Sequence, residues 1–571
     1  MRSHRAAITK TAPNPKKRFR DRVARITQPF AICLLGTLVC IGCNFKTSRP
    51  DLVIINGTEP ESLDPAIITG FAEMRIAMAL FEGLARPDPI TGKPIPGLAE
   101  RWEATDDGRV WTFYLRTNAR WSTGEPISAE DVRQSWLRVL KQETAANYAA
   151  LLFCVKGATE FYYGKTTNPE TVGITVLNPT TLSIQLTKPV PYFLDICALP
   201  VASVVPWRVI QAQSDRWLKT RPLPTSGAFQ LVHWKANHSI RLAKNPYYWD
   251  AENTQLNIVD ILPIGSPSTA LNLYLRGYAD IIWDKDMIPP ELLEELLQRP
   301  DFHKFDYLAT YFIRFNVTKP PFNDSRVRKA FAMAIDKERI VTKITRAGER
   351  IANSFVPPQT ANYIPAEGLP FDPARARRLL AEAGYPEGKG FPVVQYSFDA
   401  AARGAAKLNG KIAVELQNMW QNTLGVRVEL RQLERKIFFS AQSQLDYDIS
   451  RSSWVADYND PSTFLELFTS YNGNNRTGWK NTTYDELVTA AAVEPDMEKR
   501  AQLYYQAETL LIKEDPPIVP LFYFTGVNVF DTNKVAGIHQ NVLDLHPLNA
   551  IKKVTFTNIL PSFTHKRTGQ P

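Results

Sequence analysis

The chain has few of the residues from which reactive sites are usually built. Its 571 residues include only five cysteines and seven histidines. Beyond residue 43 no Cys-x-x-Cys pair occurs, no Cys/His cluster suggests zinc, and the spacing of His233 and His238 in HWKANH does not suit a helical metal pair. The nucleophile signature Gly-x-Ser-x-Gly and the metalloprotease signature His-Glu-x-x-His are also missing. We therefore expect no enzyme, no metal site and no cofactor.

Long apolar runs are lacking as well. The most extended run, FAICLLGTLVCIG from Phe30 to Gly42, has 13 residues, whereas a helix that spans a bilayer needs about 20. It follows a basic segment that ends at Arg25. This order is typical of a secretory signal, so residues 1–42 are predicted to be a signal peptide. An uncleaved signal anchor is the alternative.

The end of this segment is similar to bacterial lipoprotein signals, in which a small residue precedes the cysteine that receives the lipid. Gly42 fits the small residue, whereas Cys40 stands where leucine is usual. The resemblance implies lipid attachment at Cys43, which would hold the chain on a membrane surface without a span. Cys154 and Cys197 would then remain in an exported compartment, either as a disulfide or as two thiols.

The positive charge is concentrated in the leader. The chain has 67 Lys and Arg against 58 Asp and Glu, and nine of the bases but only one of the acids lie in residues 1–42. The rest of the chain therefore carries a net charge of only +1. A nucleic-acid-binding protein needs a basic face, so nucleic acid is not an expected partner.

Hydrophobic periodicity alternates between strand-like and helix-like along the body of the chain. Trp111, Phe113 and Leu115 alternate in RVWTFYLR, which predicts a strand after the turn TDDG. The segment FDPARARRLLAEAGYP offers an N-cap at Asp372 and a stop at Gly384, which predicts a helix. The helical run IAVELQNMW leads into the strand-like GVRVELRQL. The pattern predicts mixed α/β domains with βαβ units in the second half.

A series of spaced motifs runs through the chain in a fixed order. NGTEPESLDP comes first, and LFEGLARPDP, RVWTFYLR and RWSTGEPISAEDV form the densest part. TSGAFQL, KNPYYWD, FNVTKPPFNDSRVRKAFAMAID and LLAEAGYP follow. In this order the motifs resemble the peptide-binding family of extracytoplasmic solute receptors that serve oligopeptide and dipeptide ABC importers. The resemblance extends from about Leu52 to about Asn558.

The resemblance implies an α/β, two-lobed periplasmic binding protein fold with an extra small domain and a ligand enclosed between the lobes. It implies a discontinuous lobe I over residues 43–70, 200–305 and 523–563, an accessory α/β domain over 71–199, and lobe II over 306–522. The implied partners are a short peptide and the permease and ATPase subunits of an ABC importer. We expect a monomer in the periplasm or at the cell surface of a bacterium.

The stretch RSSWVADYNDPS places an acid among aromatic residues. In family members, an Asp in a Trp-x-Ala-Asp-Tyr string binds the ammonium group of the peptide, which implies this role for Asp457 beside Trp454 and Tyr458. An Arg three residues before the Trp often receives the peptide carboxylate. Arg451 matches that position, although an internal salt bridge is its alternative role. Val455 stands where some members have a disulfide cysteine.

Physical reasoning from the residues favours the same kind of site. A generic peptide offers an ammonium, a carboxylate and a backbone, and the backbone can pair as an added strand. NGTEP and SWVADY are extended enough to flank such a strand, which makes Glu59 a further candidate for ligand contact. The plainer interpretation of Asp457 is a surface turn punctuated by Pro461.

Three alternative functions remain open at this point. The same fold could bind another solute, such as a metal chelate, haem, an oligosaccharide or a cell-wall peptide. The chain could be a tethered secreted hydrolase, because paired catalytic carboxylates are not visible in a sequence. A sensory or chaperone-like role without transport is the third.

Overall fold

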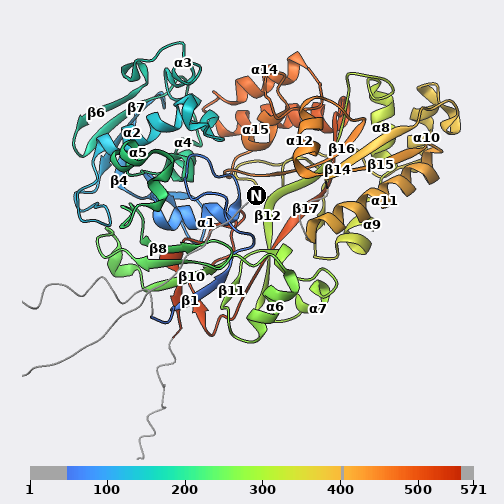
Figure 1. Ribbon diagram of the computed structural model, residues 1–571. Coiled ribbons are helices and arrows are strands. Elements are labelled where there is room, and N and C mark those ends of the chain that lie inside the picture. The colour runs from blue at the N-terminus through green and yellow to red at the C-terminus, as the bar shows by residue number, and fades with distance from the viewer. Residues whose placement is uncertain (1–47, 400–403, 555–571) are drawn as a thin grey trace, which may run out of the picture. The chain divides into compact units, whose positions relative to one another are not determined.

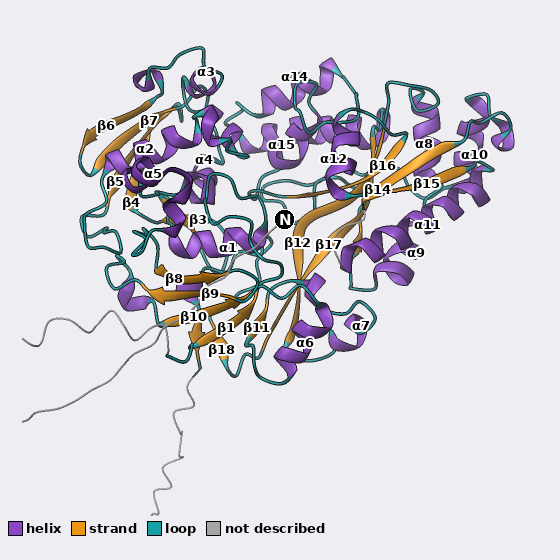
Figure 2. Cartoon of the chain, viewed as in Figure 1, coloured by secondary structure: helices purple, strands orange, loops and turns teal. Residues whose placement is uncertain are grey.

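The computed structural model describes residues 48–399 and 404–554 (Figure 1). The chain divides into two compact units, residues 1–47 and 48–571, and every element below belongs to the second unit. The predicted signal peptide and Cys43 lie outside the described residues. Mixed helices and strands make up the described part, as predicted (Figure 2).

The largest sheet within the described residues has eleven strands. Its order is β15 (Val428–Leu433), β14 (Val394–Asp399), β16 (Ile449–Val455), β12 (Phe302–Phe315), β17 (Ile518–Phe530), β11 (Ile281–Ile282), β1 (Leu52–Ile55), β10 (Ile258–Leu262), β9 (Ser239–Lys244) and β8 (Phe229–Lys235), with β13 (Arg350–Ile351) also paired to β17.

Two long antiparallel strands, β12 and β17, connect the halves of this sheet. The first part of β12 pairs opposite Val529 to Thr525, and its register shifts between Asp306 and Thr310. The predicted lobe boundaries at 305/306 and 522/523 fall inside these two strands. The register shift in β12 lies next to the predicted boundary at 305/306. Because a bulge bends a strand locally, this is where a hinge between the two lobes is expected. The division into lobes by residue number stays a prediction.

The end of the sheet in the predicted lobe II contains the predicted βαβ unit. Strands β14 and β15 are parallel, and α11 (Gly404–Leu424) connects them. The predicted helix after Asp372 is α10 (Pro373–Glu382), whose cap is the Asp372 side chain. Gly384 follows at φ 99°, a conformation that favours glycine. Helices α8 (Ser325–Met333) and α12 (Arg435–Ser443) belong to the same region.

The predicted accessory region contains a separate four-stranded sheet. Its order is β4 (Ala99–Ala104), β5 (Val110–Leu115), β7 (Thr181–Gln185) and β6 (Ile174–Asn178). Strand β5 confirms the prediction for RVWTFYLR. Helix α2 (Ala129–Val139) begins at a capping box between Ser128 and Asp131, and its Trp136 lies in the buried core of this region.

The remaining helices and short strands cover these sheets. They are α1 (Phe71–Leu80), α3 (Ala158–Tyr162), α4 (Phe193–Ala198), α5 (Trp207–Gln213), α6 (Pro267–Leu275), α7 (Leu293–Leu296), α9 (Lys337–Arg339), α13 (Ser462–Leu465), α14 (Thr482–Ala491), α15 (Met497–Thr509), β2 (Ala85–Pro87), β3 (Pro94–Pro96), β18 (Val535–Ala536) and β19 (Lys552–Lys553). Although the predicted accessory region begins at residue 71, α1 packs in the same core as β1, β8, β9 and β10.

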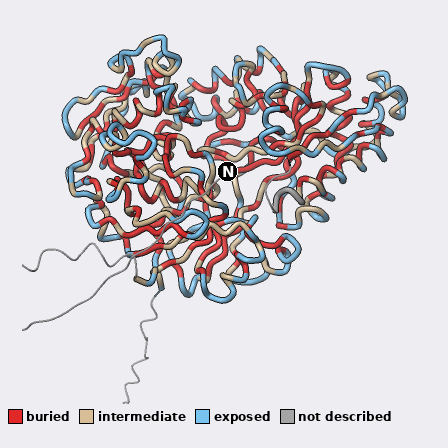
Figure 3. Tube along the Cα trace, in the orientation of Figure 1, coloured by how far each residue is buried: buried red, intermediate tan, exposed pale blue. Residues whose placement is uncertain are grey.

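Buried residues follow the strands and the inner faces of the helices (Figure 3). Among the described residues, no helix is both long and apolar enough to cross a membrane. Cys154 and Cys197 are free thiols. Of the two alternatives, a disulfide or two thiols, the structure therefore has two thiols.

Candidate functional site

Strand β16 has an open edge in its second half. On one side it pairs with β12 along its whole length, from Ile449 opposite Phe315 to Val455 opposite Ala309. On the other side β14 pairs with it only at Ile449 and Ser450. Within residues 48–399 and 404–554, no strand pairs with residues 451–455 on that side.

The backbone hydrogen bonds between β16 and β12 show which backbone groups of β16 face the open edge. The N–H of Ala456 donates to the carbonyl of Leu308 at 2.8 Å, so Ala456 faces β12. Donor and acceptor groups alternate between the two sides of an antiparallel strand. The N–H and C=O of Ser453 and Val455 therefore face away from β12, toward the open side. An extended chain could pair with these groups as an added strand.

Asp457 lies just beyond the end of this edge. Its backbone N–H donates to Thr463 Oγ1 at 3.2 Å. The hydroxyl groups of Tyr148 and Thr463 lie close enough to its carboxylate to favour the charged form. Tyr148 belongs to the predicted accessory region, so this contact joins that region to the predicted lobe II. No ion pair involves Asp457 among the residues that the structure describes.

The surroundings of this carboxyl group disfavour its charge. Asp457 lines a small cavity of about 20 Å³ whose wall also includes Ile68, Met74, Leu151 and Val201. Burial beside these apolar groups raises the pKa of Asp457 to about 7, although Tyr148 and Thr463 hold the charged form by hydrogen bonds. A cation at this position would stabilise the charged carboxylate.

An aromatic stack covers the next residue. The Tyr192 and Tyr458 rings are 4.4 Å apart at an interplanar angle of 9°. The Tyr192 hydroxyl donates to Glu466 Oε1 at 3.3 Å. Tyr458 is only 4% exposed, so it is packed against the accessory region. These contacts shield the segment that follows β16 from solvent.

Trp454 and Val455 form the end of β16. Trp454 lies opposite Thr310 and packs against the core that contains Phe464. Its indole nitrogen is buried and has no hydrogen-bond partner among the described residues. Val455 is half-buried. Trp454 therefore packs against the core behind the strand, and its role beside a ligand, like that of Val455, stays a prediction.

Arg451 has an internal partner. Its Nε donates to Asp399 Oδ1 at 2.7 Å, and its Nη1 donates to Ser453 Oγ at 3.1 Å. The Asp399 side chain is fully buried, and that of Arg451 is 13% exposed. The internal salt bridge that the sequence left open is thus present. The expected role of Arg451 toward a ligand carboxylate stays a prediction.

Glu59 also has internal partners. Its carboxylate accepts from Trp234 Nε1 at 2.6 Å and from the backbone N–H of Asn237 at 3.0 Å. Both donors belong to the β8–β9 hairpin. These bonds fix the opening segment of the chain to the hairpin, and the expected ligand contact of Glu59 stays a prediction.

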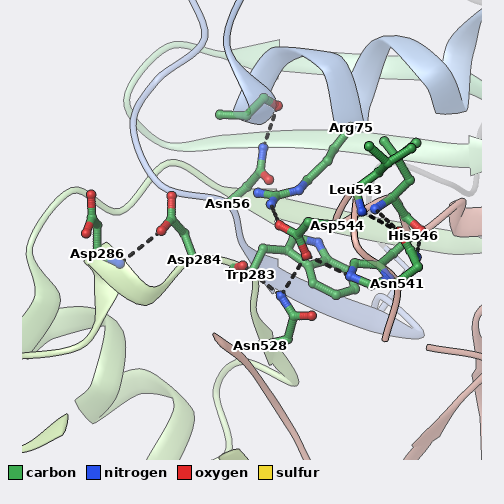
Figure 4. A network of polar contacts seen from close by, with 12 residues as sticks. Asn56, Arg75, Trp283, Asp284, Asp286, Asn528, Asn541, Leu543, Asp544 and His546 are labelled. Carbon is green, nitrogen blue, oxygen red and sulfur yellow. Dashed lines mark hydrogen bonds and ion pairs between the residues drawn. The ribbon is translucent and has the colours of Figure 1, made fainter. Parts of the chain in front are cut away.

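A second acid, Asp544, shows the opposite electrostatic situation (Figure 4). It pairs with Arg75 at 2.6 Å and with His546 at 2.8 Å, and it accepts from Asn528 at 3.1 Å. The His546 ring stacks on Trp283 at 4.8 Å. Although burial opposes its charge, Arg75 and His546 hold the pKa of Asp544 below its usual value. This acid is already neutralised inside the protein.

Sequence reasoning missed Tyr148, Tyr192 and Asp399. Tyr148 and Tyr192 lie far from Asp457 along the chain, and only the folded structure brings them together. Asp399 ends a parallel strand beside β16, a register that local pattern does not give. No group of three or more His, Cys, Asp and Glu suited to a metal ion occurs in the part of the chain that the structure describes.

The chain matches the model of a known protein family. Residues 93–476 match the model of bacterial extracellular solute-binding proteins, family 5 Middle. That range contains β16 and Asp457.

Individual relatives match over most of their length. The periplasmic oligopeptide-binding protein OppA of Salmonella typhimurium is 36% identical over 492 residues, which covers 84% of this chain and 88% of the relative. The dipeptide-binding protein DppE of Bacillus subtilis is 32% identical, with coverage of 89% and 92%. The crystal structure of OppAIV from Borrelia burgdorferi is similar at a TM-score of 0.78, with 32% identity and coverage of 89% and 100%.

Proposed function

Because the chain belongs to the bacterial extracellular solute-binding proteins of family 5, we propose that it is a receptor that captures short peptides and delivers them to an ABC-type permease. Its relatives include proteins named for oligopeptide and dipeptide binding. A structure of OppA from Haemophilus influenzae is a complex with RPPGFSPFR, and it is similar to this chain at a TM-score of 0.75 with 30% identity.

The observation that carries this proposal is the open edge of β16 next to the unpaired carboxyl of Asp457. Ser453 and Val455 offer backbone groups for strand pairing. Asp457 offers an anion that no cation of the described residues neutralises. An extended peptide with a free amino terminus supplies both of the missing partners. Ile68, Met74, Leu151 and Val201 keep the surroundings of the acid apolar, which strengthens the pairing.

The site residues support binding without chemistry on the ligand. The family is one of solute-binding proteins, and the receptor is proposed to return its peptide intact. Closure of the two lobes on the ligand would mark the loaded state for the permease and its ATPase subunits. Lipid attachment at Cys43 would keep a monomeric receptor at the membrane surface on the outer side of the permease.

Mass spectrometry of co-purifying ligand tests this function. The mature chain is purified under native conditions, denatured, and the released small molecules are sequenced. We expect a mixture of short peptides with free amino termini. Rebinding of synthetic peptides to the refolded protein by titration calorimetry then gives their dissociation constants.

A matched substitution serves as the control for this experiment. Asp446 lies in the same lobe and forms an exposed ion pair with Arg431, so Asp446→Asn should retain peptides as the unaltered chain does. Asp457→Asn should release none. Recovery of a ligand that lacks a primary amine, with equal retention by Asp457→Asn, would remove peptide capture as the function.

A further inference from the structure

The open edge of β16 is closed at its inner end by contacts within the protein. The carbonyl oxygen of Arg451 accepts from Gln442 Nε2 at 2.9 Å. The guanidinium of Arg451 donates to Asp399 at 2.7 Å and to Ser453 Oγ at 3.1 Å. The carbonyl oxygen and the guanidinium of Arg451 therefore both have partners within the protein. Only the backbone groups around Ser453 and Val455 remain for an added strand.

Asp399 depends on this arginine. The carboxyl is fully buried, its Oδ1 also accepts from Asn409 Nδ2 at 3.1 Å, and its Oδ2 has no partner among the described residues. A buried carboxylate without a cation is strongly disfavoured. If Arg451 turned toward a ligand, it would leave Asp399 in that state.

The pair also offers no net positive charge to a ligand carboxylate. A carboxylate bound at Arg451 would lie beside Asp399, and two close carboxylates repel each other. Aromatic rings limit the freedom of the arginine, since its guanidinium lies 5.9 Å from the Tyr311 ring and 5.8 Å from the Phe438 ring. The Arg451–Asp399 pair is therefore a neutral, fixed wall at the end of the edge.

We infer that Arg451 stays paired with Asp399 when ligand is bound, so the receptor recognises the amino terminus of a peptide but not its terminal carboxylate. Asp399 is the specificity-determining residue, because it neutralises the arginine. This inference rests on the proposed peptide-binding function. The expected ligands are peptides of variable length, which the receptor holds by the charged amino terminus and a short stretch of backbone.

The test compares three forms of one peptide on the unaltered mature chain by titration calorimetry. The forms are trialanine, trialanine amide and N-acetyl-trialanine. We expect the acid and the amide to bind within about threefold of each other, a difference that corresponds to about 0.7 kcal/mol. N-acetyl-trialanine should bind at least a hundredfold more weakly. A tenfold or larger preference for the free acid would overturn the inference.

A substitution at Asp399 adds a second, independent arm. Asp399→Asn removes the neutralising charge and keeps the shape, so Arg451 becomes available to a ligand carboxylate. We expect this variant to prefer trialanine over its amide by tenfold or more, whereas Asp446→Asn, which alters an exposed ion pair in the same lobe, should show no preference. An unchanged acid-to-amide ratio in Asp399→Asn would overturn the role of Asp399.

The pattern of outcomes separates this inference from the proposed function. Failure of all three peptide forms to bind, or equal binding of the acetylated form, contradicts peptide capture through Asp457. Loss of binding on acetylation together with a strong preference for the free acid leaves peptide capture intact and contradicts only the neutral role of Arg451. The comparison on the unaltered chain requires no variant to fold.

Discussion

The two charged residues that bracket the open edge of β16 differ in their surroundings. Arg451, at the inner end, is paired with a fully buried aspartate at 2.7 Å. Asp457, beyond the outer end, has the hydroxyl groups of Tyr148 and Thr463 nearby but no cation among the described residues. The two lie in one short segment, so the difference comes from what the neighbouring elements bring to each. Position in a motif does not determine whether a charge is available to a ligand.

The same contrast separates Asp457 from Asp544. Asp544 is buried with Arg75 and His546 and its pKa is lowered, whereas burial raises the pKa of Asp457 to about 7. A buried acid with internal cations stabilises the fold, and a buried acid without them reduces stability when charged. We therefore expect a ligand to bind at Asp457, the acid for which the described residues supply no cation.

The largest effect is expected from removal of the unpaired acid. Asp457→Ala leaves the ligand ammonium without its partner in a shielded site. The expected loss of binding free energy is about 3–5 kcal/mol, which is about two to four decades in the dissociation constant. Titration calorimetry with trialanine measures it. Asp446→Ala is the matched control, and an equal dissociation constant for both variants would place Asp457 outside the site.

Removal of the paired acid should instead affect folding. Asp399→Ala leaves Arg451 buried without its counter-ion, and we expect a loss of about 3 kcal/mol in the free energy of unfolding. Urea denaturation followed by circular dichroism measures this quantity. The exposed pair of Asp446 and Arg431 gives the contrast, since Asp446→Ala should change stability by less than about 1 kcal/mol. Equal stability of the two variants would mean that the buried pair contributes nothing to the fold.

The pH dependence of binding tests the environment of Asp457. Its pKa is raised to about 7, and only the ionised carboxyl attracts an ammonium, so affinity should fall as pH decreases through 7. Between pH 7.5 and pH 6 we expect about a tenfold weaker affinity, because the ionised fraction falls about tenfold per unit below the pKa. Calorimetry at matched ionic strength measures it. A constant affinity over this range would contradict the buried setting of the acid.

The smallest effect is expected from the aromatic stack beside the site. Tyr192→Ala removes the ring that lies 4.4 Å from Tyr458, and an aromatic pair contributes about 0.5–1.5 kcal/mol. If the stack helps hold the accessory region against lobe II, peptide affinity should fall about three- to tenfold. Tyr163→Ala is the control, because the Tyr163 ring makes an edge-to-face contact with Tyr162 within its own region. Equal affinities in both variants would show that the stack does not support closure.

The local sequence pattern predicted the helices and strands well, but it did not predict the contacts between side chains that are far apart in the sequence. The strand at Val110–Leu115, the helix capped by Asp372 and the β14–α11–β15 unit are encoded by residues close together in the sequence. The partner of Arg451 is not, because Asp399 reaches it through the register of two parallel strands. The resemblance indicated a charged site around residue 457, but the contacts of Tyr148 and Tyr192 depend on a separate region folding against it.

The most direct test of the account is a titration of the Asp457 carboxyl itself. Carbon-13 NMR of aspartate-labelled protein, with Asp457→Asn to assign the resonance, gives its pKa with and without trialanine. We expect a pKa of about 7 in the unliganded protein and a decrease of about two units or more when the peptide is bound, since an adjacent ammonium favours the charged form. A pKa that is the same in both states would contradict it.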